Sequence, residues 1–439
     1  MIHLSRQEIA ARIVDKRCGI FTFVDHVPSL PGSPAIQTYR GALAAPYAQL
    51  DEGLVREKMD KVIISGCSAD DDAAQWALIG EGIERYAAYR FPADRSIRAS
   101  FNELGEQALD PRDWISFADA PYGRPGQFVE FDADAPIRWT EVQPYDGGPP
   151  KLVASVFVWL RLGGTTRSEE FIQRASTGLG AGASIAQAQR SGLLEIIERD
   201  AFSSRWLLGA APQRIARQAD INDLFGDTSA KSGILADLFD IAVDDLAHVV
   251  LARLQVEGAS FSGGDFGLAL GASADTDRAN AAKKALEEAY HILQGMLHWR
   301  AQGNATVTLD EISDFLDHGH YYSQPEPASE VGWFFADRSP VERLDIADTH
   351  AEPADFEEDV ARLVSGLARQ KRPAYFVDIT PPDVKSLGFC VVRSLVPMAQ
   401  PLTCGADVTA DDRRRIQQVA GNLDLPRDTA LNYQLQPFA

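Results

Sequence analysis

The clearest hydrophobic pattern in the chain begins at Ser184, behind a glycine-rich loop, where apolar residues recur at helical spacing. Ser184 followed three residues later by Gln187 has the form of a capping box, which predicts a helix start. Along this helix Gln187, Ser191, Glu195 and Glu198 follow one another at spacings of four, four and three residues, so they form one polar stripe. The other positions are largely apolar. The pattern therefore predicts two carboxylates on a helix otherwise suited to burial.

Two interpretations of these carboxylates stand side by side. Surface glutamates commonly pair with arginines, whereas unpaired buried glutamates need a cation or a proton. A second copy of the layout favours the cation, because small residues around Gly66 precede another helical pattern that carries Glu81 and Glu84. Glu81 follows Gly66 by 15 residues, the interval that also separates Gly180 from Glu195. The two copies indicate an internal repeat that builds one site.

A third and fainter copy runs from Gly271 to about Trp299 and keeps one glutamate of the pair. Its stripe has the same four, four and three spacing and consists of Asn280, Lys284, Glu288 and His291. We therefore expect an α/β (α+β) protein in which repeated glycine-loop and helix units pack on β-sheets.

Four converging carboxylates, from Glu81, Glu84, Glu195 and Glu198, would make a strong site for Mg²⁺. Magnesium prefers oxygen ligands and is commonly shared between carboxylates and phosphates, which points to a nucleotide such as ATP. Neither a Walker-type phosphate loop nor the set of kinase motifs is present. An ATP site in this chain would therefore be atypical.

The composition argues against a nucleic-acid-binding protein and is consistent with a globular one. The formal net charge is −21, so no basic excess is available to neutralise phosphates, and we expect no nucleic-acid partner. Hydrophobic residues make up 45% of the 439 residues, which allows a sizeable core.

The cysteines and the apolar stretches indicate a cytoplasmic protein. The four cysteines are scattered without Cys-x-x-Cys or zinc-type histidine spacing, as expected for reduced thiols in the cytosol. The N-terminal residues lack a signal-peptide core, and the longest apolar stretch, 152–160, is too short to span a bilayer. We expect no membrane partner.

The chain is expected to form a single unit over 1–439, with a loop-rich excursion at about 93–150 and an insertion or lid at about 301–345. The latter contains a His-x-His-Tyr-Tyr cluster starting at His318, a weak metal candidate because no partner ligands lie at helical spacing. The tail near Pro437, taken alone, would be a frayed end.

Outside the repeats, the hydrophobic pattern predicts further elements. They are helices over 5–14 and 353–370, and strands over 19–24, 61–65, 152–162, 249–256, 266–270, 374–379 and 389–395.

Several separated motifs resemble the YcaO family, and most closely its members that form azoline rings in ribosomal peptides. The motifs are GEGIER (80–85), ALDPR (108–112), STGLGAG (176–182), LEIIERD (194–200), DITPPDV (378–384), VVRSLVP (391–397) and the ending PFA (437–439). They occur in the family's order and extend over nearly the whole chain.

The resemblance implies a YcaO-type fold around an ATP site and an ATP-dependent peptide cyclodehydratase. In such enzymes a Cys, Ser or Thr side chain of a precursor peptide attacks the preceding backbone carbonyl. ATP phosphorylates the resulting oxyanion, and loss of phosphate leaves a thiazoline or oxazoline. The family belongs to the biosynthesis of ribosomally made, modified peptides such as thiazole/oxazole-modified microcins and other bacteriocins.

The resemblance also assigns roles to residues. Paired glutamates hold Mg²⁺ against the phosphates, the task already expected of Glu81, Glu84, Glu195 and Glu198. Nucleotide binding would further involve Arg199, which meets phosphate charge, together with Gln187 and Glu288. Gln187 stands where the family often has Glu, and a neutral amide cannot supply charge to a metal. Glu288 and His291 stand where the family tends to place Glu and Gln.

The proline-rich C-terminus of azoline formers is thought to reach the active site. This assigns catalytic roles to Pro437 and to the terminal carboxylate of Ala439 as general base. The final residue is Ala439 rather than proline, which departs from the family pattern.

The expected partners are a precursor peptide, a leader-peptide-binding protein related to ubiquitin-activating enzymes, and a flavin-dependent azoline dehydrogenase; we also expect an oligomer. Two alternatives to azoline formation stay open. One is thioamide or amidine formation, which uses an external sulfide or amine with the same ATP activation. The other is a non-catalytic accessory or scaffold subunit.

Overall fold

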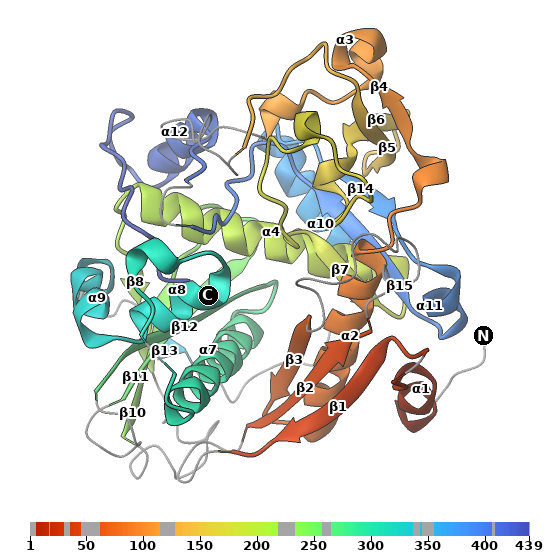
Figure 1. The fold of residues 1–439 in the computed structure, drawn as a ribbon. Coiled ribbons are helices and arrows are strands. Elements are labelled where there is room, and N and C mark those ends of the chain that lie inside the picture. The colour runs from red at the N-terminus through yellow and green to blue at the C-terminus, as the bar shows by residue number, and fades with distance from the viewer. Residues whose placement is uncertain are drawn as a thin grey trace.

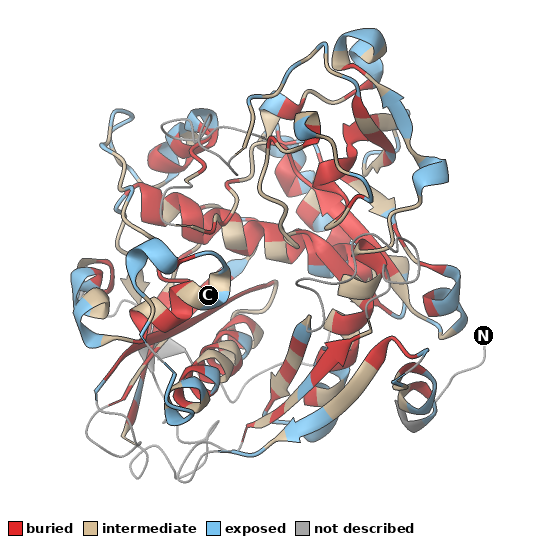
Figure 2. Cartoon of the chain, viewed as in Figure 1, coloured by how far each residue is buried: buried red, intermediate tan, exposed pale blue. Residues whose placement is uncertain are grey.

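The computed structural model describes residues 6–16, 18–29, 36–44, 62–114, 128–217, 233–256, 265–304, 306–336, 343–344, 355–405 and 409–438. Mixed helices and sheets surround the long helix α4 (Ile185–Leu207), which crosses the middle of the molecule (Figure 1). Figure 2 shows buried residues along most of α4. Among the described helices, none offers an apolar stretch of membrane-spanning length.

Four sheets carry the described strands. A three-stranded sheet has the order β1 (Phe21–Val27), β2 (Gln37–Leu43) and β3 (Ile63–Ser68). A four-stranded sheet has the order β12 (Phe266–Asp275), β11 (His248–Val256), β10 (Ile234–Asp240) and β8 (Gln213–Arg214). A six-stranded sheet has the order β4 (Ile97–Ala99), β5 (Ile137–Pro144), β14 (Tyr375–Asp378), β15 (Cys390–Leu395) and β7 (Leu179–Gly182), with β6 (Lys151–Ala154) also on β5. The short strands β13 (Arg343–Leu344) and β9 (Ala216–Arg217) pair in parallel.

The helices besides α4 differ widely in length. They are α1 (Arg6–Ile13), α2 (Asp71–Ala88), α3 (Phe101–Leu104), α7 (Arg278–Ala301), α8 (Phe315–Tyr322), α9 (Pro325–Glu330), α10 (Phe356–Arg369), α11 (Pro382–Ser386) and α12 (Arg413–Asn422). The predicted helices and strands outside the repeats all formed except the strand over 152–162, with boundaries shifted by a few residues.

The three predicted sequence copies are three strand–helix units: β3 with α2, β7 with α4, and β12 with α7. Each helix packs on the strand of its own unit and also contacts the strand of the next: α2 contacts β7, α4 contacts β12, and α7 contacts β3. The units therefore close into a ring, which brings three similar helix faces towards one another.

The repeated glycines permit the close packing of strand on helix. A Cβ atom at Gly66, Gly180 or Gly271 would overlap the backbone of the helix in the same unit. The shortest distances would be 2.2 Å from Gly66 to Leu78 N, 2.1 Å from Gly180 to Ala188 O, and 2.2 Å from Gly271 to Ala289 N. Only glycine fits where the two backbones approach this closely.

Strand β11 shows why several strands are continuous apolar runs. Val249 and Leu251 belong to the core cluster that contains α4, whereas Val250 and Ala252 belong to the cluster that contains α7. Because helices cover both faces of this sheet, successive residues are buried on opposite sides.

One sequence expectation about the secondary structure needs correction. The strand expected over 152–162 is wrong, because β6 ends at Ala154 and a 3₁₀ turn covers Ser155–Phe157. These residues are buried on all sides, and an apolar run alone does not reveal its backbone geometry. In the described part of 93–150, β5 lies inside the six-stranded sheet and Trp139 is fully buried, and the loop-rich excursion stays a prediction.

The expected insertion or lid contains helices that contact the sheet of the third unit. In the described part of 301–345, α8 and α9 pack on β12. Tyr322 and Phe334 are buried in the same cluster as α4. These described residues therefore contribute to the core, and the insertion or lid stays a prediction.

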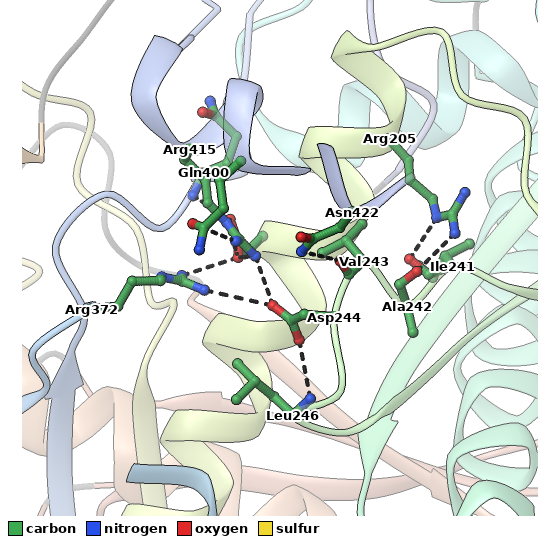
Figure 3. A network of polar contacts seen from close by, with 12 residues as sticks. Arg205, Ile241, Ala242, Val243, Asp244, Leu246, Arg372, Gln400, Arg415 and Asn422 are labelled. Carbon is green, nitrogen blue, oxygen red and sulfur yellow. Dashed lines mark hydrogen bonds and ion pairs between the residues drawn. The ribbon is translucent and has the colours of Figure 1, made fainter. Parts of the chain in front are cut away.

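A buried ion network ties α4 to distant segments (Figure 3). Asp200 lies 3.0 Å from Arg372 Nη2 and 2.6 Å from Arg415 Nη2, and Arg415 also lies 3.0 Å from Asp244. All four side chains are almost completely buried. The network fixes the helix two residues beyond Glu198.

Candidate functional site

The first glutamate of each unit is held by its own strand. The backbone N–H of Gly178 donates a 2.9 Å hydrogen bond to Glu195 Oε2, and that of Ala272 donates a 2.9 Å hydrogen bond to Glu288 Oε2. The backbone of Ser65 likewise donates to Glu81. The three repeats thus direct equivalent carboxylates with equivalent backbone contacts, which explains why the sequence copies share a glutamate.

The carboxylates lie close enough to affect one another's protonation. Burial raises the pKa of Glu84 to about 8, and the charges of Glu195 and Glu81 contribute. Burial also raises the pKa of Glu198, with Glu288 and Glu195 adding to the rise. Carboxylates from all three units therefore share one electrostatic environment, as the repeat predicted.

Burial acts in the same direction on Glu288 and Glu81. Burial raises the pKa of Glu288 to about 7 against the opposing effect of Arg199. Burial raises the pKa of Glu81 as well, although its side chain keeps 35% of its exposure. Carboxyls that resist ionisation in this way favour a ligand that brings positive charge.

Three arginines surround the carboxylates. Arg199 Nε lies 3.1 Å from Glu198 Oε1, and Arg85 Nη2 lies 3.4 Å from Glu81 Oε1. Burial lowers the pKa of Arg393 to about 10 against the charges of Glu195 and Glu84. Arg199 keeps a raised pKa because Glu198 and Glu195 outweigh the effect of its burial.

Arg393 also bonds the loop that precedes β7, the strand of the unit that carries Glu195. Its Nη1 donates to the carbonyl of Ser176 at 2.8 Å, and its Nη2 donates to that of Ala175 at 2.9 Å. The VVRSLVP motif pointed to Arg393 only through the family likeness. Its contacts with the glycine loop could not be predicted, because they join residues 217 and 218 positions apart.

The donor set fits Mg²⁺ shared with phosphates. Within the described residues, no three His, Cys, Asp or Glu side chains are gathered closely enough to hold a metal alone. Magnesium commonly takes only one or two carboxylates and completes its shell with phosphate and water. Glu81, Glu84, Glu195 and Glu198 supply the oxygen ligands that such a shared ion needs; their role as ligands stays a prediction.

Gln187 lies at the start of α4. Ser184 is the N-cap, as predicted, and its hydroxyl accepts from the backbone N–H of Gln187 at 3.2 Å. The side chain of Gln187 turns back and accepts from the backbone N–H of Ala183 at 2.8 Å. The nucleotide-binding role of Gln187 stays a prediction.

The stripe of the third unit includes a neutral histidine. Burial lowers the pKa of His291 to about 4, so the ring is uncharged near pH 7. Beside it Glu288 is the residue that joins the carboxylate group, as its Coulomb effect on Glu198 shows.

The C-terminal tail is ordered against the site, so the expectation of a frayed end is wrong. Pro437 and Phe438 are buried. The guanidinium carbon of Arg199 lies 4.6 Å from the centre of the Phe438 ring. Pro437 thus directly precedes the residue whose ring packs on the arginine that pairs with Glu198. Ala439, the other predicted catalytic residue, lies outside the described residues.

The His-x-His-Tyr-Tyr cluster divides into different roles. His318 Nδ1 bonds the carbonyl of Gln436 at 2.8 Å, whereas the ring of His320 packs 4.2 Å from that of Trp299. The two rings have different partners, which argues against the weak metal candidate.

Sequence reasoning missed two buried acids beside the site. Asp200 anchors α4, and Glu287 accepts hydrogen bonds from Ser68 and Ala69. Asp200 lies two residues after Glu198, and Glu287 directly precedes Glu288. A charged residue on the apolar side of a helix was the available signal.

Two cavities lie near these elements. One of about 90 Å³ is lined by Thr177, Ile196 and Arg393, directly beside the glycine loop. Another of about 800 Å³ lies between β5, β14 and α11, and no site glutamate lines it. We consider the smaller one part of the site because it contains Arg393.

A family model described as YcaO cyclodehydratase, ATP- and Mg²⁺-binding, matches residues 65–400. Comparison with curated protein sequences gives no match. The fold is similar to that of a heterocyclase in complex with substrate and cofactor, with a TM-score of 0.75 and 20% identity, over 98% of this chain and 56% of that chain. The present chain therefore spans little more than half the length of that heterocyclase.

Two shorter proteins match over most of their length. One is YcaO from Methanopyrus kandleri bound with AMPPCP and Mg²⁺, with a TM-score of 0.58 and 18% identity, over 87% of this chain and 86% of that chain. The other belongs to the E. coli microcin synthetase McbBCD complex with pro-MccB17 bound, with a TM-score of 0.56 and 14% identity, over 85% and 86%. At these identities the structures establish the fold. Since the family model covers most of the chain, the chain belongs to the YcaO cyclodehydratase family, which binds ATP and Mg²⁺.

Proposed function

We propose that this chain catalyses ATP-dependent cyclodehydration of Cys, Ser or Thr residues in a ribosomally made precursor peptide. The observation that carries the proposal is the meeting of carboxylates from three strand–helix units with Arg199 and Arg393. This is the composition expected where a metal-bound triphosphate is held.

The proposed reaction closes a five-membered ring. The side-chain sulfur or oxygen loses its proton to the general base and forms a bond to the preceding carbonyl carbon, and the carbonyl oxygen takes the γ-phosphoryl group, with ADP as the leaving group. The C–O bond then breaks, phosphate leaves, and the amide nitrogen loses its proton to give the azoline. Bound MgATP supplies the phosphoryl group.

The chain's own residues bind and orient in this scheme. The glutamate pairs would hold Mg²⁺, while Arg199 would balance phosphate charge. Pro437 and the terminal carboxylate of Ala439 would lie near the peptide, with the carboxylate as general base. The buried contact between Phe438 and Arg199 supports a tail at the site.

Partners follow from the same proposal. We propose a precursor peptide as substrate, a leader-binding subunit related to ubiquitin-activating enzymes, and a flavin-dependent dehydrogenase that oxidises the rings. An oligomeric, cytoplasmic enzyme remains our expectation. The McbBCD complex contains a bound peptide precursor together with several subunits, which supports partners of this kind.

The test measures ATP turnover and peptide mass together. Wild type, Glu195→Gln and Glu198→Gln are incubated with candidate precursor peptides and partner proteins encoded beside the gene. Glu170→Gln is the matched control, because Glu170 is an exposed partner of Arg167 away from the glutamate stripe. We expect loss of the mass of one water per modified residue, coupled to ATP use, in wild type and control only.

Other outcomes select the alternatives. ATP use with the mass change of a thioamide or an amidine would move the assignment to that chemistry. Absence of both ATP binding and turnover would indicate an accessory subunit. The retained glutamates weigh against the latter, because a scaffold has no need of carboxyls with raised pKa values.

A further inference from the structure

The C-terminal tail follows α4 towards the glutamates. The backbone N–H of Asn432 donates to the carbonyl of Leu207 at 2.7 Å, and Trp206 Nε1 donates to the carbonyl of Gln434 at 2.8 Å. Further along, the Phe438 ring lies under Arg199. The tail thus runs from the last turn of α4 back to the residue next to Glu198.

Helix α8 holds the same tail from the opposite side. His318 Nδ1 bonds the carbonyl of Gln436 at 2.8 Å, and the Tyr322 hydroxyl donates to the carbonyl of Leu435 at 2.5 Å. His318 is completely buried and Tyr322 is 2% exposed. These two side chains therefore bond consecutive carbonyls of the tail where water does not compete.

The contacts of His318 define which ring nitrogen carries the proton. Its Nε2 accepts from the backbone N–H of Gly405 at 3.2 Å, so Nδ1 carries the hydrogen that is donated to Gln436. The side-chain nitrogen of Gln436 also lies 3.1 Å from Nδ1 and donates to the carbonyl of Thr403 at 3.3 Å. Burial lowers the pKa of His318, although the carbonyl of Gln436 and the charge of Asp317 act in the opposite direction. The ring is therefore neutral.

His318 also connects the tail to the glycine loop. Gly405 follows Cys404, whose backbone N–H donates to Gln173 Oε1 at 2.8 Å. Gln173 precedes Ala175, whose carbonyl accepts from Arg393. One imidazole thus bonds both the tail and Gly405, and the neighbouring Cys404 bonds the segment that leads to the loop in front of Glu195.

We propose that His318 and Tyr322 are positioning residues: from α8 they hold the C-terminal tail on α4 beside Glu198 for ring formation. This deepens the proposed function and rests on it. His318 and Tyr322 of the His-x-His-Tyr-Tyr cluster thus order a peptide segment through hydrogen bonds from uncharged side chains.

Hydrogen exchange of the tail tests the proposal without substrate or nucleotide. In His318→Asn, the side-chain amide reaches about as far as Nδ1 and still donates to Gln436. In His318→Gln, the amide oxygen reaches about as far as Nε2 and still accepts from Gly405. His318→Phe removes both bonds. Tyr322→Phe removes the bond to Leu435, and Tyr321→Phe is its control because Tyr321 takes no part in the tail contacts described above.

We expect the backbone amides of 434–436 and 438 to exchange roughly two- to tenfold faster in His318→Gln, His318→Phe and Tyr322→Phe than in wild type, as the loss of one hydrogen bond implies. His318→Asn and Tyr321→Phe should keep wild-type exchange. Equal exchange in His318→Asn and His318→Gln would overturn the proposal, because packing alone would then explain the effect.

Turnover of the precursor peptide provides a second test of the positioning role. In the precursor-peptide assay, variants with a loosened tail should lose kcat while the KM for ATP stays unchanged, and His318→Asn should keep most of its kcat. Unchanged kcat in a variant with faster tail exchange would overturn the positioning role. Because exchange needs no substrate, a failed azoline assay leaves the tail result standing, and the two failures are distinguishable.

Discussion

The hydroxyl of Ser68 donates a 2.9 Å hydrogen bond to the buried carboxylate of Glu287, at the contact between the first and third strand–helix units. The backbone N–H of Ala69 donates a second bond of 2.9 Å to the same oxygen. The next residue, Glu288, instead bonds Ala272 and joins the site carboxylates. Two adjacent glutamates of α7 therefore have different roles, one in closing the ring of units and one in the site.

Substituting each of these two glutamates should separate an effect on stability from an effect on MgATP binding. Glu287→Ala leaves Ser68 and Ala69 without their acceptor, so we expect a loss of about 1–3 kcal/mol in the free energy of unfolding. Glu288→Gln should change that free energy by less than about 1 kcal/mol, because its carboxyl already resists ionisation, yet it should weaken MgATP binding. Urea unfolding and ATP titration measure the two effects. A stable Glu287→Ala variant would contradict the assignment.

The ligand-free protein should lose stability as the pH rises through the raised pKa values. The pKa of Glu84 is about 8 in the folded protein and has an ordinary value of 4.5, so the folded state binds more protons between these limits. The free energy of unfolding then falls with rising pH, because stability follows the excess of bound protons. In Glu84→Gln this fall should be smaller. Unfolding midpoints of both proteins at pH 6 and pH 8.5 measure the difference, and identical slopes would refute it.

A methyl group on the packed glycines should be strongly destabilising. At Gly180 a Cβ atom would lie 2.1 Å from the carbonyl oxygen of Ala188 and 2.9 Å from the nitrogen of Gly192. Both neighbouring atoms belong to the backbone of α4, which cannot move aside without a large energetic cost. Gly180→Ala should therefore lower the free energy of unfolding by about 2–3 kcal/mol. Gly80→Ala is the control, since nothing lies within 4 Å of its Cβ position in α2. That variant should gain about 0.5–1 kcal/mol, and similar values for both would contradict the packing argument.

Neighbouring arginines of α12 should differ sharply in importance. Arg415 is buried between Asp200 and Asp244, whereas the Arg414 side chain is 53% exposed and pairs with Asp412 and with the exposed Asp113. Arg415→Met leaves two buried carboxylates with Arg372 alone and should cost about 3–5 kcal/mol. Arg414→Met should cost less than about 1 kcal/mol. Thermal or urea unfolding of the two variants provides the comparison, and equal costs would show that the buried network contributes little.

Much of the site was accessible from local patterns. The stripe from Gln187 to Glu198 and the equal intervals between Gly66 and Glu81 and between Gly180 and Glu195 predicted a repeat, and the structure contains it as strand–helix units. Helical and strand periodicity depend on neighbouring residues, which is why most predicted elements formed. The strand over 152–162 failed because complete burial removes the alternation that identifies a strand.

The sequence by itself determined the repeated units, the glutamates that they carry and the family to which the chain belongs, because these depend on spacing along the chain. Only the tertiary structure decided how the units close into a ring and that Glu287 and Glu288 diverge. It likewise decided that α8 binds the tail through a hydrogen bond from His318. Those contacts join residues more than a hundred positions apart, where packing and hydrogen-bond geometry, and not local periodicity, select the partner.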